Sequence, residues 1–75
     1  MKDAVAELVQ RIDPAITIHD FRVVPGKTHT NVIFDAVVPP GLPMTDEAVA
    51  ERIRQLVDDA YPNHYAEVDI DQSYV

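Results

Sequence analysis

The sequence predicts an α+β fold of the two-layer type, in which two helices pack on one face of a small β-sheet. Apolar residues recur at helical spacing in two segments and alternate with polar residues in three others. Breaks that contain proline or glycine separate most of these segments. The chain has 75 residues, the size of one small domain spanning residues 1–75. The predicted order of elements is α-β-β-α-β.

The first helix is predicted over residues 1–12. Its apolar face would consist of Val5, Leu8, Val9 and Ile12. Asp13 precedes Pro14, and a residue before proline is disfavoured in a helix, so the helix should end there. Because this helix begins with almost no preceding chain, we expect the domain to be part of a longer protein.

Two strands are predicted over residues 15–24 and 29–38. Residues 25–28 should form a tight turn between them, with Pro25 at position i+1 and Gly26 at position i+2 of a type II turn. The pair would therefore be a β-hairpin. Side-chain parity in the first strand switches near His19 and Asp20, which predicts a β-bulge at that point.

The second helix should begin after the proline-rich connection of residues 39–43. Thr45 is its predicted N-cap, and two acidic residues follow in the first turn, where the helix dipole favours negative charge. Residues 61–63, Tyr-Pro-Asn, should end this helix. The last strand is then predicted over residues 65–74.

Composition excludes several classes of function. The chain has no cysteine, so disulfides, thiolate metal sites and cysteine nucleophiles are excluded. Thirteen acidic residues against six basic ones give a net charge of −7, which argues against a nucleic-acid partner. No apolar run is long enough to cross a bilayer, so no direct lipid contact is expected. No nucleophile–base pair or cofactor motif is evident, and the protein is not expected to be an enzyme.

Strand parity predicts a subunit interface. On the second strand Val32, Phe34, Ala36 and Val38 share one face, which should pack on the helices. The opposite face carries Ile33 and Val37, which two helices on the other side could not cover. We therefore predict a homodimer whose interface includes Ile33 and Val37. The competing interpretation is that these residues only reflect β-propensity.

Four side chains could converge on that same outer face, namely His19, Asp35, Asp69 and Asp71. Carboxylates that lie close together repel one another unless a cation lies between them. One imidazole with carboxylates is a suitable ligand set for zinc or another divalent transition metal. The alternative is that they are ordinary solvated residues of exposed strands, and parity by itself favours this alternative.

The sequence Ile-His-Asp-Phe-Arg-Val at residues 18–23 resembles the His-Asp-Leu-Arg-Val stretch in the cytoplasmic C-terminal domain of cation diffusion facilitator transporters. Residues 28–39 and 65–75 are similar to the second and last strands of that domain. The resemblance implies a ferredoxin-like or metallochaperone-like sandwich with an antiparallel or mixed three-stranded sheet. It also implies a two-fold dimer, attached to the transmembrane domain of the same chain on the cytoplasmic side of an inner or plasma membrane.

The resemblance further implies a regulatory domain that senses cytosolic zinc or a related metal. In zinc-exporting members of the family the site uses the His of the His-Asp motif, a His on the second strand and a His-x-Asp on the last strand. His19 matches the first position, Asp35 stands near the second, and Asp69 and Asp71 match the last pair, with Asp69 replacing the His. This harder ligand set leaves zinc as the first expectation, with manganese, iron or cobalt as alternatives. Two other functions stay open: a metal-independent dimerisation scaffold, and a free-standing domain that senses a small molecule.

Overall fold

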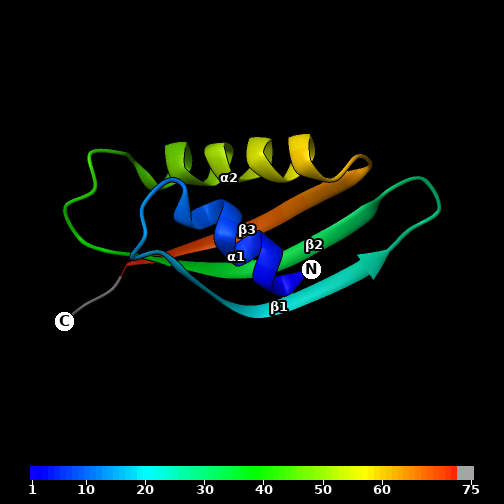
Figure 1. Cartoon of the computed structure of the whole chain (residues 1–75), viewed down its shortest axis with the longest axis horizontal. Coiled ribbons are helices and arrows are strands. Elements are labelled where there is room, and N and C mark those ends of the chain that lie inside the picture. The colour runs from blue at the N-terminus through cyan, green and yellow to red at the C-terminus, as the bar shows by residue number, and fades with distance from the viewer. Residues whose placement is uncertain (73–75) are drawn as a thin grey trace.

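The computed structural model describes residues 1–72, and Figure 1 shows that its elements follow the predicted order. The helices are α1 (Lys2–Gln10) and α2 (Asp46–Ala60). The strands are β1 (Thr17–Pro25), β2 (Thr30–Val38) and β3 (His64–Gln72). The α+β sandwich of order α-β-β-α-β is therefore confirmed. The predicted strand over residues 65–74 begins one residue earlier than expected, and its last two positions lie outside the described residues.

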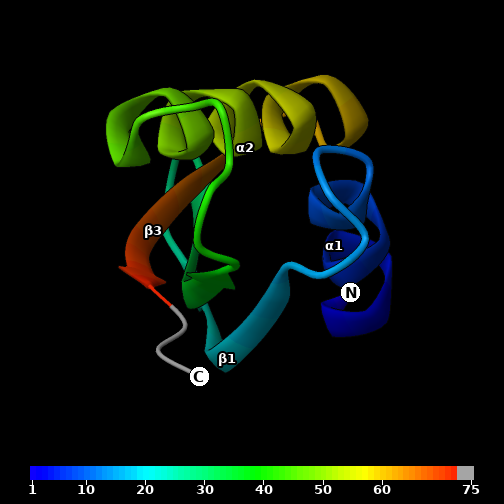
Figure 2. The same ribbon diagram turned by 90° about the vertical axis from the view of Figure 1, so that its left-hand side faces the viewer.

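The sheet is mixed, with β2 at its centre. β1 pairs antiparallel with β2, and β3 pairs parallel with β2 on the other side. A parallel pair needs a long crossover connection, which α2 supplies between the two strands. Both helices lie on the same side of the curved sheet, as Figure 2 shows, so neither α1 nor α2 covers the opposite face.

The core lies between the helices and the inner face of the sheet. Alternate residues of β2 point into it, and Val32 and Phe34 are only 0% and 1% exposed. The Phe34 ring lies 6.1 Å from that of Phe21, between ring centroids. The remaining core residues with less than 2% exposure are Val5, Val9, Ile16, Ala36, Val49, Ile53 and Val57. The predicted inner face of β2 is thus confirmed. Of the apolar face predicted for the first helix, Val5, Leu8 and Val9 are buried, whereas Ile12 lies beyond the end of α1 and is partly buried.

The hairpin turn differs from the expected one. A type II turn needs a positive φ at Gly26, but the glycine with positive φ is Gly41, at 84°. Instead, Pro25 pairs with Thr30, and the Gly26 N–H donates to the His29 carbonyl over 2.9 Å. A Cβ atom on Gly26 would lie 2.6 Å from that carbonyl oxygen. Glycine is therefore required at this position for close approach rather than for its backbone dihedrals.

The predicted bulge in the first strand is confirmed. His19 pairs with Asp35, but the next paired residue of β1 is Arg22, opposite Ile33. Asp20 lies within this irregularity with φ at 54°, a left-handed conformation that aspartate tolerates better than most residues. The bulge therefore changes which side chains of β1 reach the outer face.

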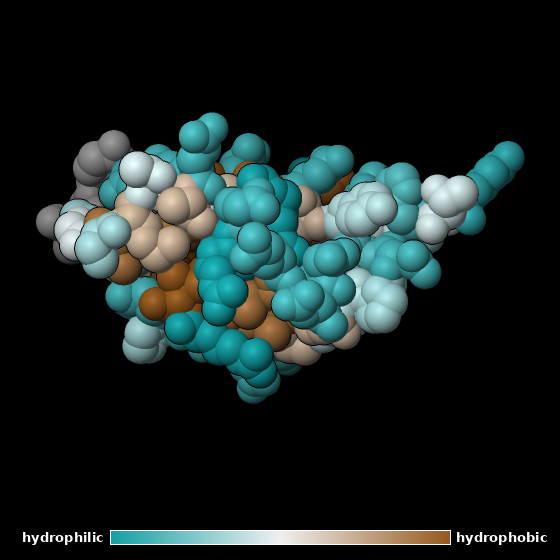
Figure 3. Space-filling model, turned by 90° about the horizontal axis from the view of Figure 1, so that it is seen from above, coloured by the Kyte–Doolittle hydropathy of each residue, from teal (hydrophilic) through white to brown (hydrophobic). Residues whose placement is uncertain are grey.

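Thr45 caps α2 as predicted. Its hydroxyl oxygen accepts a hydrogen bond from the Ala48 N–H over 3.1 Å, and Asp46 and Glu47 occupy the first turn. Seen from above α2 in Figure 3, the surface is mostly hydrophilic with some hydrophobic patches, which fits a helix with one buried face. Within residues 1–72, no helix combines the length and apolar character needed to cross a membrane.

Candidate metal centre

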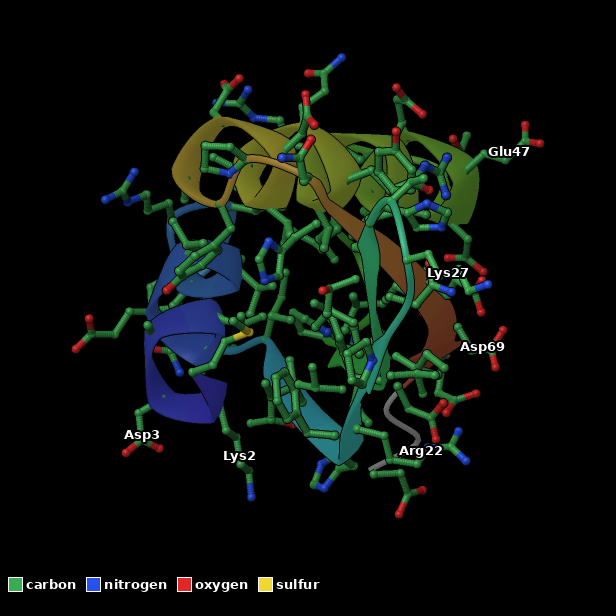
Figure 4. The ribbon with its side chains drawn as sticks, turned by 90° about the vertical axis from the view of Figure 1, so that its right-hand side faces the viewer. Lys2, Asp3, Arg22, Lys27, Glu47 and Asp69 are labelled. Atoms are coloured by element: carbon green, nitrogen blue, oxygen red, sulfur yellow. The ribbon has the colours of Figure 1, made fainter. Side chains whose placement is uncertain are left out.

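The candidate residues lie on the sheet face that neither helix covers. In Figure 4, Arg22 and Asp69 extend on the side of the sheet away from α1. Outer positions of β3 are exposed, whereas those of β2, including Asp35, are partly buried by their neighbours on the sheet. The outer face therefore has polar side chains on both edges and a partly desolvated centre.

Register aligns three of the four predicted residues in one row. His19 pairs with Asp35 across β1 and β2, and Asp35 pairs with Asp69 across β2 and β3. Adjacent strands lie about 4.8 Å apart, so each pair in this row is a pair of direct neighbours. The expected alignment of His19, Asp35 and Asp69 on one face thus follows from the observed pairing.

Asp71 belongs to the next row. It pairs with Val37, which pairs in turn with Thr17. His19 extends towards this second row, because its Nε2 atom lies 3.1 Å from the Thr17 hydroxyl oxygen. This hydrogen bond occupies one ring nitrogen of His19 and leaves Nδ1 without a hydrogen bond among the described residues.

Asp20 joins the outer face although the sequence did not single it out as a site residue. The bulge turns its side chain towards Asp35, with which it makes a hydrogen bond when one carboxyl is protonated. Asp20, Asp35, Phe21 and Arg22 together line a shallow hollow of about 410 Å³. The predicted bulge was the signal that could have identified Asp20, because a bulge places two successive side chains outside the normal alternation.

The pKa of Asp35 lies above its ordinary value of 3.8. Partial desolvation is the largest cause, since it disfavours the charged form. The hydrogen bond with Asp20 and the negative charges of Asp20, Asp71 and Asp69 raise the pKa further. A cation placed among these carboxylates would oppose the same repulsion.

These side chains do not form a ready-made metal site in the single chain. Within residues 1–72, no group of three or more histidine or acidic side chains is positioned to hold a metal ion. Geometry explains this, because the outer positions of a three-strand row lie about 10 Å apart. Zinc ligand atoms must lie about 2 Å from the ion. Ligation by the row would need side-chain rearrangement or further ligands from outside the chain.

Ile33 and Val37 lie on either side of the Asp35 position. Ile33 pairs with Arg22 and Glu67, and Val37 pairs with Thr17 and Asp71. Both are half-buried within the single chain, between side chains that are mostly charged or polar. The outer face of β2 therefore carries Asp35 between two apolar residues.

The two other histidines lie at the hairpin end of the sheet. His29 Nδ1 lies 3.1 Å from the Thr28 hydroxyl oxygen, and the His29 ring is 4.6 Å from that of Tyr65. His64, the first residue of β3, directs Nδ1 to the Pro62 carbonyl oxygen over 2.9 Å. Both rings thus have local partners, several residues along the strands from the Asp35 row.

Comparison with known proteins gives a structural match and no sequence match. No family model matches the chain, and no curated protein matches it by sequence. A structure of CzrB, a protein described as a zinc transporter, superposes with a TM-score of 0.74 at 16% sequence identity. The match covers 96% of this chain and 92% of the CzrB chain.

A second CzrB structure, described as the zinc form, gives a TM-score of 0.73 at 16% identity. It covers 96% of this chain and 84% of the CzrB chain. At this level of identity the comparison establishes a shared architecture. The chain therefore has the α-β-β-α-β fold seen in the structures of the zinc transporter CzrB.

Proposed function

We propose that this chain is the cytoplasmic, dimerising and metal-sensing domain of a divalent-cation efflux transporter of the cation diffusion facilitator type. The observation that carries the proposal is the fold match to CzrB over 96% of the chain. The His-Asp motif at residues 19–20 lies at the β-bulge beside the central strand, which supports the same assignment. In this proposal residues 1–75 form one domain, attached to a transmembrane domain of the same polypeptide.

Zinc is the proposed ligand, held on the outer face of the sheet by members of the set His19, Asp35, Asp69 and Asp71. Each adjacent pair in the row His19–Asp35–Asp69 could supply two ligand atoms, while zinc usually takes four. A second subunit facing this row could supply the others. Because oxygen ligands outnumber nitrogen in this set, manganese, iron or cobalt are the alternative ions.

The homodimer is proposed to form through the same face, with Ile33 and Val37 in the contact. Both side chains are only partly buried in the single chain, and neither helix lies over them. Apposition of two such faces would bring acidic rows together, and divalent cations would relieve their repulsion. In this way metal binding and association would be coupled, which is what a sensing domain requires.

Calorimetric titration of the metal-free chain with Zn²⁺, in parallel with sedimentation, tests the proposal. We expect saturable binding, together with a shift of the sedimenting species towards a dimer or a more compact dimer. Manganese should bind through the same residues, with an affinity that differs from that of zinc. The absence of saturable binding by any divalent transition metal would reject metal sensing.

A metal-independent dimerisation scaffold is the second candidate. The observation that favours it is the lack of a preassembled three-ligand group within residues 1–72. A scaffold would form the same dimer with and without a chelator, whereas a sensor would change its association constant or shape. Sedimentation in EDTA and in Zn²⁺ therefore distinguishes the two functions.

A further inference from the structure

The free edge of β3 is a regular strand edge without a partner in the described chain. The strand order β1-β2-β3 leaves both outer strands with one open side. At the β1 edge, the bulge between His19 and Arg22 interrupts the strand, which ends at Pro25. β3 keeps an unbroken register with β2 over nine residues and contains no proline. Bulges and prolines protect sheet edges, so β3 is the edge that remains open to strand addition.

Backbone pairing shows which residues face this edge. The Thr30 N–H donates to the Asn63 carbonyl over 2.8 Å, while Thr30 is in register with His64. In a parallel ladder, alternate residues bond to the neighbour, so Ala66, Val68 and Ile70 direct their N–H and C=O groups away from β2. Within residues 1–72, these three residues make no backbone hydrogen bonds to turns or loops.

A groove lies beside the first part of this edge. Glu51, Arg54, Gln55 and Asp58 follow one another at helical spacing on α2 and line one wall. The first three residues of β3 line the other wall, and the open volume is about 330 Å³. The inward side chains of a strand added next to Ala66 would enter this groove, because side chains alternate between the two faces of a sheet.

The negative charge around the β3 edge favours an added strand with positive charge. On the outer face β3 presents Glu67, Asp69 and Asp71 at alternate positions, all exposed. On the groove side, Arg54 is paired with Glu51 at 2.8 Å, so Asp58 keeps the groove negative. Pairing of two β3 edges would set these outer carboxylates beside like charges, which disfavours a second copy as the occupant.

We propose that the β3 edge and the adjoining α2 groove bind an extended, basic segment of a partner polypeptide by strand addition. Its backbone pairs with Ala66, Val68 and Ile70. Its lysine or arginine side chains lie beside Glu67 and Asp69, and its small apolar side chains enter the groove. This mode of recognition uses main-chain hydrogen bonds for affinity and alternate side chains for specificity. The proposal does not depend on metal binding at the outer face.

An NMR titration of the ¹⁵N-labelled chain in EDTA tests the proposal. The probe is an acetylated and amidated peptide of alternating lysine and valine, six residues long. We expect saturable shifts centred on the amides of Ala66, Val68 and Ile70, and slower hydrogen exchange at these amides. The same peptide with an N-methyl group on every backbone amide keeps its charge but cannot donate to the ladder on either edge, so it should lose at least tenfold in affinity.

Two further controls separate strand addition from general attraction between opposite charges. A glutamate–valine peptide should show no binding. The variant Glu67→Lys should bind the lysine peptide about fivefold more weakly, as expected for loss of one cross-strand charge pair. Equal binding of the N-methylated peptide, or shifts confined to the outer face around Asp35, would overturn the proposal.

Discussion

The carboxyl groups of Asp20 and Asp35 are neighbours across the β-bulge and share a hydrogen bond when one of them is protonated, although they lie on different strands. Asp20 lies in the bulge in a left-handed conformation, with φ at 54°, and lines the same hollow as Asp35. A proton is needed for this hydrogen bond, so the protonated carboxyl donates and the other accepts. The arrangement therefore favours the protonated form of Asp35 and makes its charged form unfavourable in metal-free protein.

This relationship predicts the pH dependence of stability. Since the pKa of Asp35 is higher in the folded chain than its ordinary value of 3.8, the folded state binds its proton more tightly than the unfolded state. Ionisation of Asp35 therefore lowers the free energy of unfolding, and this loss is fully present above the folded-state pKa. The loss disappears as pH falls through that pKa towards 3.8. We expect Asp35→Asn to raise the melting temperature at pH 7 in EDTA and to have little effect near pH 3.

The matched control is Glu7→Gln, which removes one exposed carboxylate from α1. Its melting temperature at pH 7 should change little, because the side chain is exposed. An Asp35→Asn protein that melts at or below the native temperature at pH 7 would contradict the expected cost of charging Asp35.

Removal of two proposed ligands should abolish the response to metal. A metal that binds only the folded form stabilises it by RT ln(1 + [L]/Kd), about 2.7 kcal/mol at a hundredfold excess over Kd. The double variant Asp69→Asn with Asp71→Asn should lose most of this gain in thermal melts with Zn²⁺. Its metal-free form should be at least as stable as the native chain, because repulsion around Asp35 is reduced.

His29→Ala is the control for that experiment, because His29 contacts Thr28 and Tyr65 rather than the Asp35 row. It should keep the full response to Zn²⁺. The native response should also weaken as pH falls through the imidazole range, since His19 must be neutral to bind a metal. If the double variant responds to Zn²⁺ like the native chain, the ligand assignment is wrong.

A charge at Ile33 should disrupt the proposed dimer. Ile33→Glu would place a further carboxylate at the contact, between Arg22 and Glu67, and burying this charge at the centre of an interface costs several kcal/mol. Sedimentation equilibrium at micromolar protein should show a dimer for the native chain and an 8.4 kDa species for the variant. Met44→Glu, in the connection before α2, should remain dimeric. A native chain that sediments only as a monomer would exclude this interface.

Truncation of the central core residue should destabilise the domain strongly. Phe34 is 1% exposed and stacks against Phe21, so Phe34→Ala would leave a cavity beneath both helices. Buried phenylalanine-to-alanine changes cost about 3–5 kcal/mol, which is a large part of the stability of a small domain. Urea unfolding monitored by circular dichroism measures this loss. Val23→Ala, at a site 42% exposed, should cost much less.

Local signals in the sequence were sufficient to predict most of the fold. Thr45 was recognised as a cap because its hydroxyl precedes two acidic residues, and it accepts the expected hydrogen bond. The alternation of residues 32–38 identified the buried face of β2, because a strand side chain can reach only one side of the sheet. The parity switch at His19 identified the bulge for the same reason.

Features that depend on contacts between residues far apart in the chain were harder to predict from the sequence. The conformation of Gly26 depends on its approach to the His29 carbonyl, so Pro25–Gly26 gave the wrong turn type. The parallel direction of β3 depends on the path of α2 across the sheet, and the residues of β3 are compatible with either direction. For the candidate site, parity aligned His19, Asp35 and Asp69, but the backbone conformation that adds Asp20 appears only in the folded chain.

The parallel pairing of β2 with β3 also has a consequence for the order of folding. β1 and β2 are joined by a short turn, so they can pair early, whereas β3 can pair with β2 only after the long α2 crossover is closed. Until β3 pairs, one edge of β2 is exposed to solvent. The apolar side chains of β2 lie next to this open edge. We expect this partly assembled hairpin state to be the species most prone to aggregation during refolding. Docking of β3 would therefore both complete the sheet and end the period in which β2 can pair with another molecule.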